Sequence, residues 1–129
     1  MNVMGSTTAL MSWKEFERLD LEGPEETELL QGELIQMPPP KFRHMASCER
    51  LFLLLRAALE SHRPSNPEVR LGKVHMEMGY RLSGAPPSWL RPDVSISHPD
   101  QAGDDYYEGA PFMVFEVVSE SDTAMRLER

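Results

Sequence analysis

A long stretch with helical spacing, residues 44–62, constrains the fold of this chain more than any other feature. Its apolar residues recur so that they fall on one face of a helix: Cys48, Leu51, Phe52, Leu55 and Leu59. Charged residues such as Arg56 and Glu60 fall elsewhere, and Pro64 cannot continue the helix. The pattern predicts an amphipathic helix that buries its apolar face against another layer of structure.

A shorter helix is predicted near the start of the chain. Ser12 has the properties of an N-cap, and Glu15 stands where a capping box needs its reciprocal partner. Met11 and Phe16 are spaced as in a hydrophobic staple. These residues together predict a helix over residues 13–19.

A β-hairpin is predicted between the two helices. Residues 28–30 and 33–35 are strand-like, and they flank the dipeptide Gln31-Gly32. A glycine in a two-residue connection is typical of a tight hairpin turn. The prolines at 38–40 then end the second strand, because proline has no amide to donate to a ladder.

Three strands are predicted after the long helix. Residues 73–82 alternate between apolar and polar side chains, which indicates one half-buried strand. Residues 93–97 predict a shorter strand, and the almost wholly apolar residues 112–119 predict a central strand buried on both faces. A last helix is expected over residues 123–129.

The succession of elements predicts a mixed α/β fold in one domain. The length of 129 residues suits a single domain with a modest core. We expect residues 1–10 to be a flexible N-terminus and residues 11–129 to form the domain.

The composition bounds the cell compartment and the binding partners. The formal net charge of −8 argues against a protein that coats nucleic acid through a broad basic surface, although a local basic groove stays compatible with it. Cys48 is the single cysteine and cannot form an internal disulfide, which favours a reducing cytoplasm. The longest apolar run, residues 51–55, is too short to cross a membrane, and the N-terminus has no secretion signal.

Glu116 is the residue that opens a functional hypothesis. It interrupts the apolar strand predicted at 112–119, where an ionised carboxylate needs a cation or hydrogen-bond donors to offset its burial. Asp93 begins another predicted strand after Pro92. If the two strands are neighbours, both carboxylates can bind one hard cation such as Mg²⁺. The spacing alone leaves a second interpretation equally open, in which both acids are structural.

An ordered set of segments resembles the Uma-two family of restriction-endonuclease-like domains. The segments comprise residues 27–38, His44 at the head of a helix, and residues 91–96, 109–119 and 121–124. That family is similar to the PD-(D/E)XK nucleases. The resemblance therefore implies a restriction-endonuclease-like mixed β-sheet flanked by helices.

The resemblance also implies roles for individual residues. Asp93 would be the motif aspartate and Glu116 the motif glutamate, holding Mg²⁺ or Mn²⁺ for hydrolysis of DNA. Glu33, and less strongly Glu28, are candidates for a further catalytic acid, with a solvated hairpin glutamate as the alternative. His44 would contact a phosphate or serve only the helix start.

One departure from the family pattern qualifies the expected activity. The lysine of the general motif stands two residues after the glutamate, and that slot holds Val118. Family members supply a lysine from the following helix, so we expect a chain that lacks its C-terminal part and is impaired. The alternative is a non-catalytic remnant that acts as a binding module. Many nucleases of this fold pair to cut both strands, so a homodimer is one alternative, and the sequence leaves the oligomeric state open.

Overall fold

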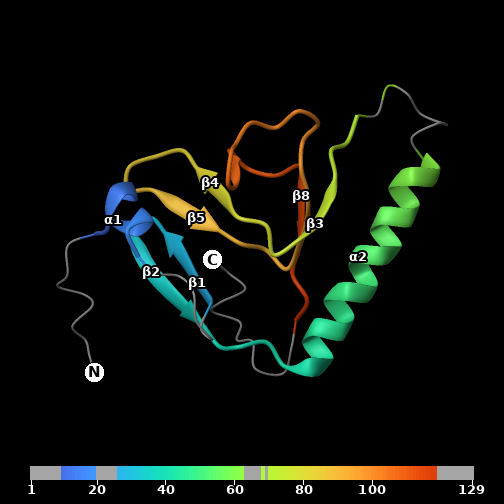
Figure 1. Cartoon of the computed structure of the whole chain (residues 1–129), viewed down its shortest axis with the longest axis horizontal. Helices are drawn as coiled ribbons and strands as arrows, with labels where there is room; N and C mark the ends of the chain where they lie inside the picture. Colours follow the sequence, from blue (N-terminus) through green and yellow to red (C-terminus); the bar gives the residue numbers. More distant parts are fainter. Residues whose placement is uncertain (1–9, 20–25, 63–67, 69, 119–129) are drawn as a thin grey trace. The chain divides into compact units, whose positions relative to one another are not determined.

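The chain forms two compact units, each built around its own sheet, in a computed structural model. The structure describes residues 10–19, 26–62, 68 and 70–118 (Figure 1). Five junctions carry the chain from one unit to the other: Pro39–Pro40, Met78–Gly79, Arg91–Pro92, Ala102–Gly103 and Ala110–Pro111. No helix among the described residues is both long enough and apolar enough to traverse a bilayer.

Unit 1 holds a mixed five-stranded sheet in the order β2-β1-β5-β4-β7. Its elements are α1 (Trp13–Glu17), β1 (Glu26–Leu30), β2 (Glu33–Met37), β4 (Tyr80–Leu82), β5 (Ser88–Leu90) and β7 (Tyr107–Glu108). Neighbouring strands are antiparallel except for β4 and β7, which are parallel. The core of this unit consists of Phe16 from α1, Leu29 from β1 and Trp89 from β5.

The hairpin prediction is confirmed. β1 and β2 pair so that Leu30 faces Glu33, which leaves Gln31 and Gly32 as a two-residue turn. Both turn residues have positive φ, 48° and 85°, as a type I′ turn requires. This turn matches the right-handed twist of the strands, and β2 ends at Met37 before the prolines.

The capping box of α1 is also confirmed. The Glu15 amide donates to Ser12 Oγ at 3.2 Å, and the Ser12 amide donates to Glu15 Oε1 at 2.9 Å. These hydrogen bonds lower the pKa of Glu15 from its ordinary value. The helix ends at Glu17, two residues before the predicted boundary, and it buries Phe16 in the core.

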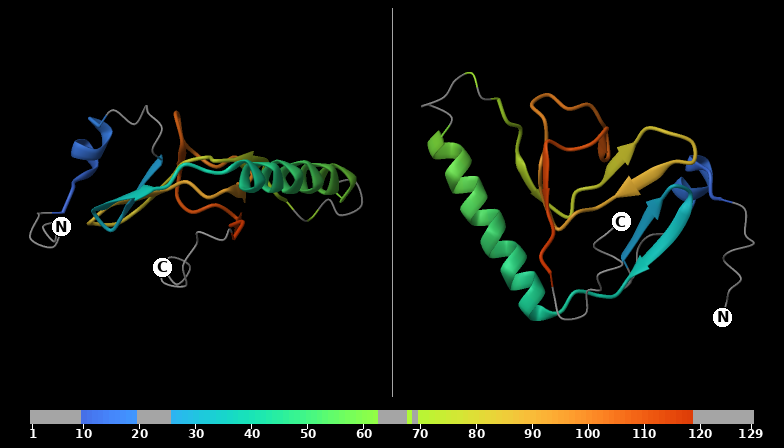
Figure 2. Two further views of the ribbon diagram at one scale, coloured as in Figure 1. Left: turned by 90° about the horizontal axis from the view of Figure 1, so that it is seen from below. Right: turned by 180° about the vertical axis from the view of Figure 1, so that it is seen from behind.

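Unit 2 combines the long helix with a three-stranded antiparallel sheet in the order β3-β6-β8. Its elements are α2 (Phe42–His62), β3 (Val74–Met76), β6 (Val94–Ile96) and β8 (Met113–Phe115). The predicted helix is confirmed, with a start two residues earlier at Phe42. It runs beside this sheet, where it contacts β3 and β6 (Figure 2), and Cys48 is its buried residue.

The central strand β6 supplies most of the buried side chains of unit 2. Val94 and Ile96 are 0% and 4% exposed, and Ser95 and Ser97 are buried as well. Small hydroxyl side chains alternate here with branched apolar ones, so both faces of the strand are covered. The short strand predicted at 93–97 is confirmed within one residue at each end.

The single strand predicted over residues 73–82 is wrong. β3 and β4 belong to different sheets, and the break falls between Met76 and Tyr80. Glu77 adopts a left-handed backbone conformation with φ of 48°, which ends the regular strand. Gly79 is required at the start of the next segment because a Cβ there would overlap the Trp89 indole.

The central strand predicted over residues 112–119 is also wrong. β8 has only three residues and lies at the edge of its sheet, and Met113 and Val114 are 44% and 50% exposed. Within the described residues, only β6 pairs with β8, so one edge and much of its apolar surface stay uncovered.

Other sequence-based predictions have different outcomes. The strands β5 and β7 lie in segments for which the sequence predicted no strand. The predicted last helix at 123–129 falls outside the described residues, as do residues 1–9 of the predicted flexible start. The prediction of one domain over residues 11–129 stays a prediction.

Candidate metal centre

Asp93 and Glu116 directly flank the paired strands β6 and β8. In the ladder between β6 and β8, Val94 faces Phe115. The same register, continued by one residue past this pair, would bring Asp93 opposite Glu116. Residues that face each other across an antiparallel pair project to the same side of the sheet. The strands are therefore neighbours, as the metal hypothesis requires.

The Asp93 carboxylate is held by two different groups. Its Oδ2 accepts a hydrogen bond from the Val117 amide at 2.8 Å. Its Oδ1 lies 3.3 Å from His44 Nε2, and the two side chains are only 20% and 18% exposed. The Asp93 carbonyl also accepts from the Glu77 amide at 3.1 Å. Backbone and side-chain contacts together fix the orientation of this carboxylate.

His44 and Cys48 approach Asp93 from one face of α2. They are one helical turn apart, so their side chains lie on the same side of the helix. Cys48 Sγ is 3.4 Å from His44 Nε2. The imidazole nitrogen, the thiol sulfur and a carboxylate oxygen all lie within 4.8 Å of one another. The group is a candidate cation site, and its ligand atoms converge.

The same three residues do not form a nucleophile triad. In a triad the nucleophile contacts one imidazole nitrogen and the orienting acid contacts the other. Here Cys48 and Asp93 both lie next to Nε2 of His44. Nδ1 is buried and has no hydrogen-bond partner among the described residues. This geometry suits a shared cation and not proton relay between a thiol and a carboxylate.

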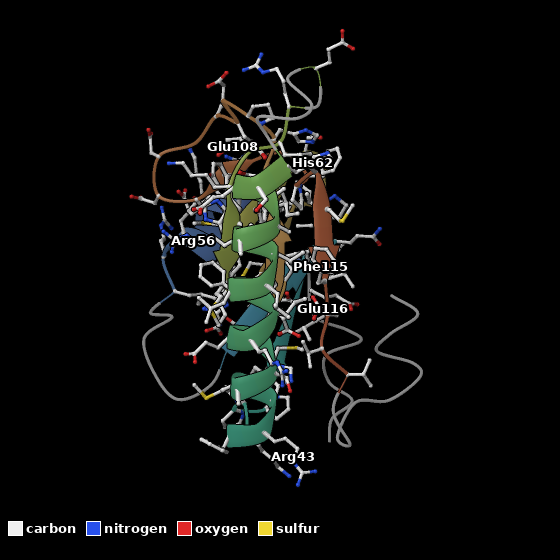
Figure 3. The ribbon with its side chains drawn as sticks, turned by 90° about the vertical axis from the view of Figure 1, so that its right-hand side faces the viewer. Arg43, Arg56, His62, Glu108, Phe115 and Glu116 are labelled. Atoms are coloured by element: carbon white, nitrogen blue, oxygen red, sulfur yellow. The ribbon has the colours of Figure 1, made fainter. Side chains whose placement is uncertain are left out.

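Glu116 differs from the sequence-based prediction in its surroundings. It follows Phe115 at the end of β8 (Figure 3), and it is exposed and not buried in an apolar strand. The burial predicted for Glu116 is therefore wrong, because β8 is short and lies at an edge of its sheet. Glu116 is not one of the residues whose ligand atoms converge on Asp93 Oδ1.

The other predicted site residues are placed as follows. Glu33 is an exposed residue at the start of β2 in unit 1, and its catalytic role stays a prediction. Glu28 accepts a hydrogen bond from the Arg91 amide at 2.8 Å, which is a structural role within unit 1. Val118 is 63% exposed, so the slot where the general motif has lysine faces solvent.

Sequence reasoning missed the part that Cys48 plays beside His44. The sequence placed Cys48 on the apolar face of the helix and His44 as a phosphate contact or a helix-start residue. The signal was present, because a histidine and a cysteine four positions apart on a helix share a face. Their approach to Asp93 is a long-range contact, which helical spacing does not reveal.

Comparison with known proteins identifies the family. The family model Uma2, described as "Putative restriction endonuclease", matches residues 13–129. The chain belongs to this family. The match covers almost the whole chain and bears out the resemblance carried by the ordered segments. No curated protein matches the chain.

A solved structure has the same fold. It is described as a "putative nuclease belonging to DUF820" from Anabaena variabilis, with a TM-score of 0.64 and 17% identity. The match covers 92% of this chain and 64% of that one. The Uma2 chain thus has a nuclease-like mixed α/β fold, as predicted. It spans 64% of the length of that neighbour, and its predicted truncation stays a prediction.

Proposed function

We propose that this Uma2 chain binds Mg²⁺ or Mn²⁺ through Asp93 and Glu116 and belongs to a nuclease that hydrolyses phosphodiester bonds of DNA. The observation that carries the proposal is the register of β6 and β8, in which Val94 pairs with Phe115, so that extending it by one residue would bring Asp93 opposite Glu116. Two carboxylates are a suitable donor set, because Mg²⁺ binds to one or two carboxylates and keeps several waters.

Each residue has a separate part in this proposal. The Val117 amide donates a hydrogen bond to Oδ2 of Asp93 and thereby fixes the orientation of the carboxylate. Glu116 is exposed, so its carboxylate is accessible to a hydrated cation and to a phosphate group. A bound divalent cation supplies Lewis-acid stabilisation and an activated water. Glu33 is retained as a proposed further acid, and His44 as a proposed phosphate contact.

Val118 limits the activity expected from this chain. Lysine two residues after the motif glutamate would share the face of Glu116, and valine cannot supply its charge. We therefore expect weak cleavage. A non-catalytic binding module is the alternative, and Val118 together with the net charge of −8 favours it. A cytoplasmic location and a homodimer are parts of the same proposal.

Metal binding is tested by calorimetry with Mn²⁺ on the wild type, Asp93→Asn and Glu116→Gln. Asp104→Asn is the matched control, because Asp104 is exposed in a loop of unit 1. We expect each site variant to weaken Mn²⁺ binding at least about tenfold and the control to bind as the wild type does. Equal binding by all four proteins would contradict the proposed site.

Cleavage is tested by a gain of function. Val118→Lys places the missing cation two residues after Glu116, and Val114→Lys places one two residues before it, both at exposed positions. We expect Val118→Lys, and not Val114→Lys, to raise EDTA-sensitive nicking of a supercoiled plasmid above the wild-type rate. No increase, with Mn²⁺ binding intact, would favour the binding module.

A further inference from the structure

We propose that His44, Cys48 and Asp93 form a second kind of metal site, one that takes a thiophilic transition-metal ion such as Zn²⁺. The ion would bind to Nε2, Sγ and Oδ1, the three ligand atoms that converge in unit 2. This site differs from the proposed Mg²⁺ site, because it includes a thiolate and an imidazole and leaves out Glu116. The two sites share Asp93.

The separations of the ligand atoms match those around a tetrahedral ion. Zn²⁺ bonds of about 2.0–2.1 Å to nitrogen, about 2.3 Å to sulfur and about 2.0–2.2 Å to oxygen put neighbouring ligand atoms about 3.4–3.6 Å apart. The observed separations are 3.4 Å from Sγ to Nε2 and 3.3 Å from Nε2 to Oδ1. The sulfur and the carboxylate oxygen lie within 4.8 Å of one another.

The protein holds all three ligands before any ion arrives. His44 and Cys48 project from successive turns of the long helix α2, and Cys48 is only 5% exposed. Asp93 is oriented from its far oxygen by the Val117 amide. Ligands that are already fixed lose little conformational freedom on binding, so even three of them can bind an ion tightly.

The chemistry of the set selects the ion. Thiolate and imidazole favour Zn²⁺ or Co²⁺, whereas Mg²⁺ takes oxygen ligands. A metal ion on Nε2 requires the tautomer that carries its proton on Nδ1, which is buried and has no hydrogen-bond partner among the described residues, so this unpaired N–H opposes binding. Three protein ligands also leave a fourth tetrahedral position for water.

A regulatory consequence follows, and this step rests on the proposed function. Since Asp93 serves both sites, an ion bound to His44 and Cys48 withdraws Asp93 from the pair with Glu116. Zn²⁺ would then compete with Mn²⁺ for the chain. The alternative is that His44 only makes a hydrogen bond with Asp93, in which case Cys48 contributes nothing to metal binding.

The test titrates the full chain with Co²⁺ and follows the near-ultraviolet charge-transfer band that thiolate-bound cobalt produces. We expect this band in the wild type, and its displacement by an equimolar amount of Zn²⁺. Cys48→Ser should abolish the band and lower Zn²⁺ affinity at least about tenfold, since it removes a ligand. His62→Gln is the matched control on α2, because His62 is exposed and lies outside the ligand group.

Two further variants separate this inference from the proposed function. Glu116→Gln should weaken Mn²⁺ binding and keep the cobalt band, whereas Cys48→Ser should keep Mn²⁺ binding. Asp93→Asn should weaken both. Absence of the band in the folded wild type, or unchanged Zn²⁺ affinity in Cys48→Ser, would overturn the transition-metal site. Neither result would affect the assignment of Asp93 and Glu116.

Discussion

The Val117 amide donates a hydrogen bond of 2.8 Å to Oδ2 of Asp93. A side chain at the start of β6 is thereby attached to the backbone just beyond β8. The bond continues the pairing of the two strands past the last ladder residues and holds the Glu116 segment next to Asp93. Asp93 is therefore structural as well as a candidate metal ligand.

Two substitutions of Asp93 should separate these roles. Asp93→Ala leaves the half-buried Val117 amide without its acceptor, which costs about 1–3 kcal/mol of unfolding free energy. Asp93→Asn keeps a carbonyl oxygen at this position and should cost clearly less, although it loses the charge that binds a cation. Urea unfolding of both variants measures the difference. Equal destabilisation would show that the Val117 contact contributes nothing.

The capping box predicts a cost for Ser12→Ala. The variant loses the side-chain acceptor of the Glu15 amide, and we expect a loss of about 1 kcal/mol. Thermal or urea unfolding followed by circular dichroism measures it. Ser47→Ala, on an exposed position of α2, is the control and should be neutral or slightly stabilising. A neutral Ser12→Ala would mean that α1 is held by the packing of Phe16 alone.

The turn between β1 and β2 predicts that Gly32→Ala is strongly destabilising. Its φ of 85° is costly for alanine, and the new Cβ would lie 2.8 Å from Leu10 Cβ and 2.9 Å from Pro86 Cβ. We expect a loss of more than about 1 kcal/mol. Gly84→Ala is the control, because Gly84 also has positive φ but the nearest atom is 3.7 Å away. Similar losses at both positions would assign the effect to the backbone conformation and not to crowding.

His75 predicts a loss of stability in mild acid. Burial lowers the pKa of His75 from 6.5, and the positive charge of Lys73 lowers it further. The unfolded chain therefore takes up a proton at a higher pH than the folded protein does. The stabilisation is complete above pH 6.5 and is lost as the pH falls below it.

Urea midpoints measured from about pH 7 to about pH 5.5 test this prediction. His75→Gln should flatten the decline with falling pH, because glutamine does not titrate. His62→Gln removes an exposed imidazole and controls for the loss of one histidine. An identical decline in the wild type and His75→Gln would exclude His75 as its source.

Local signals predicted the parts of the fold that short segments determine. Ser12 with Glu15, and Gln31 with Gly32, fix a helix start and a turn through contacts within a few residues. The break between β3 and β4 near Glu77 could not be predicted from the sequence, because apolar and polar side chains go on alternating through it. The need for glycine at position 79 comes from Trp89, ten residues away, on a strand that proline-rich flanks concealed.

The sequence pointed to Asp93 and Glu116 as candidate residues but not to their environment. The apolar neighbours of Glu116 predicted burial, but exposure depends on which strands and helices cover β8, and that is a tertiary property. The pairing of Asp93 with the Glu116 segment followed the family resemblance. The approach of Cys48 and His44 to Asp93 depends on how α2 packs beside β6, which no single segment specifies.

The five junctions at which the polypeptide alternates between its two sheets have an evolutionary meaning. Neither half is a contiguous cassette, so recombination cannot transplant one sheet into another gene without bringing pieces of its companion. We therefore expect proteins of this architecture to diversify by lengthening connections or replacing surface residues, and not by exchange of a whole sheet between genes.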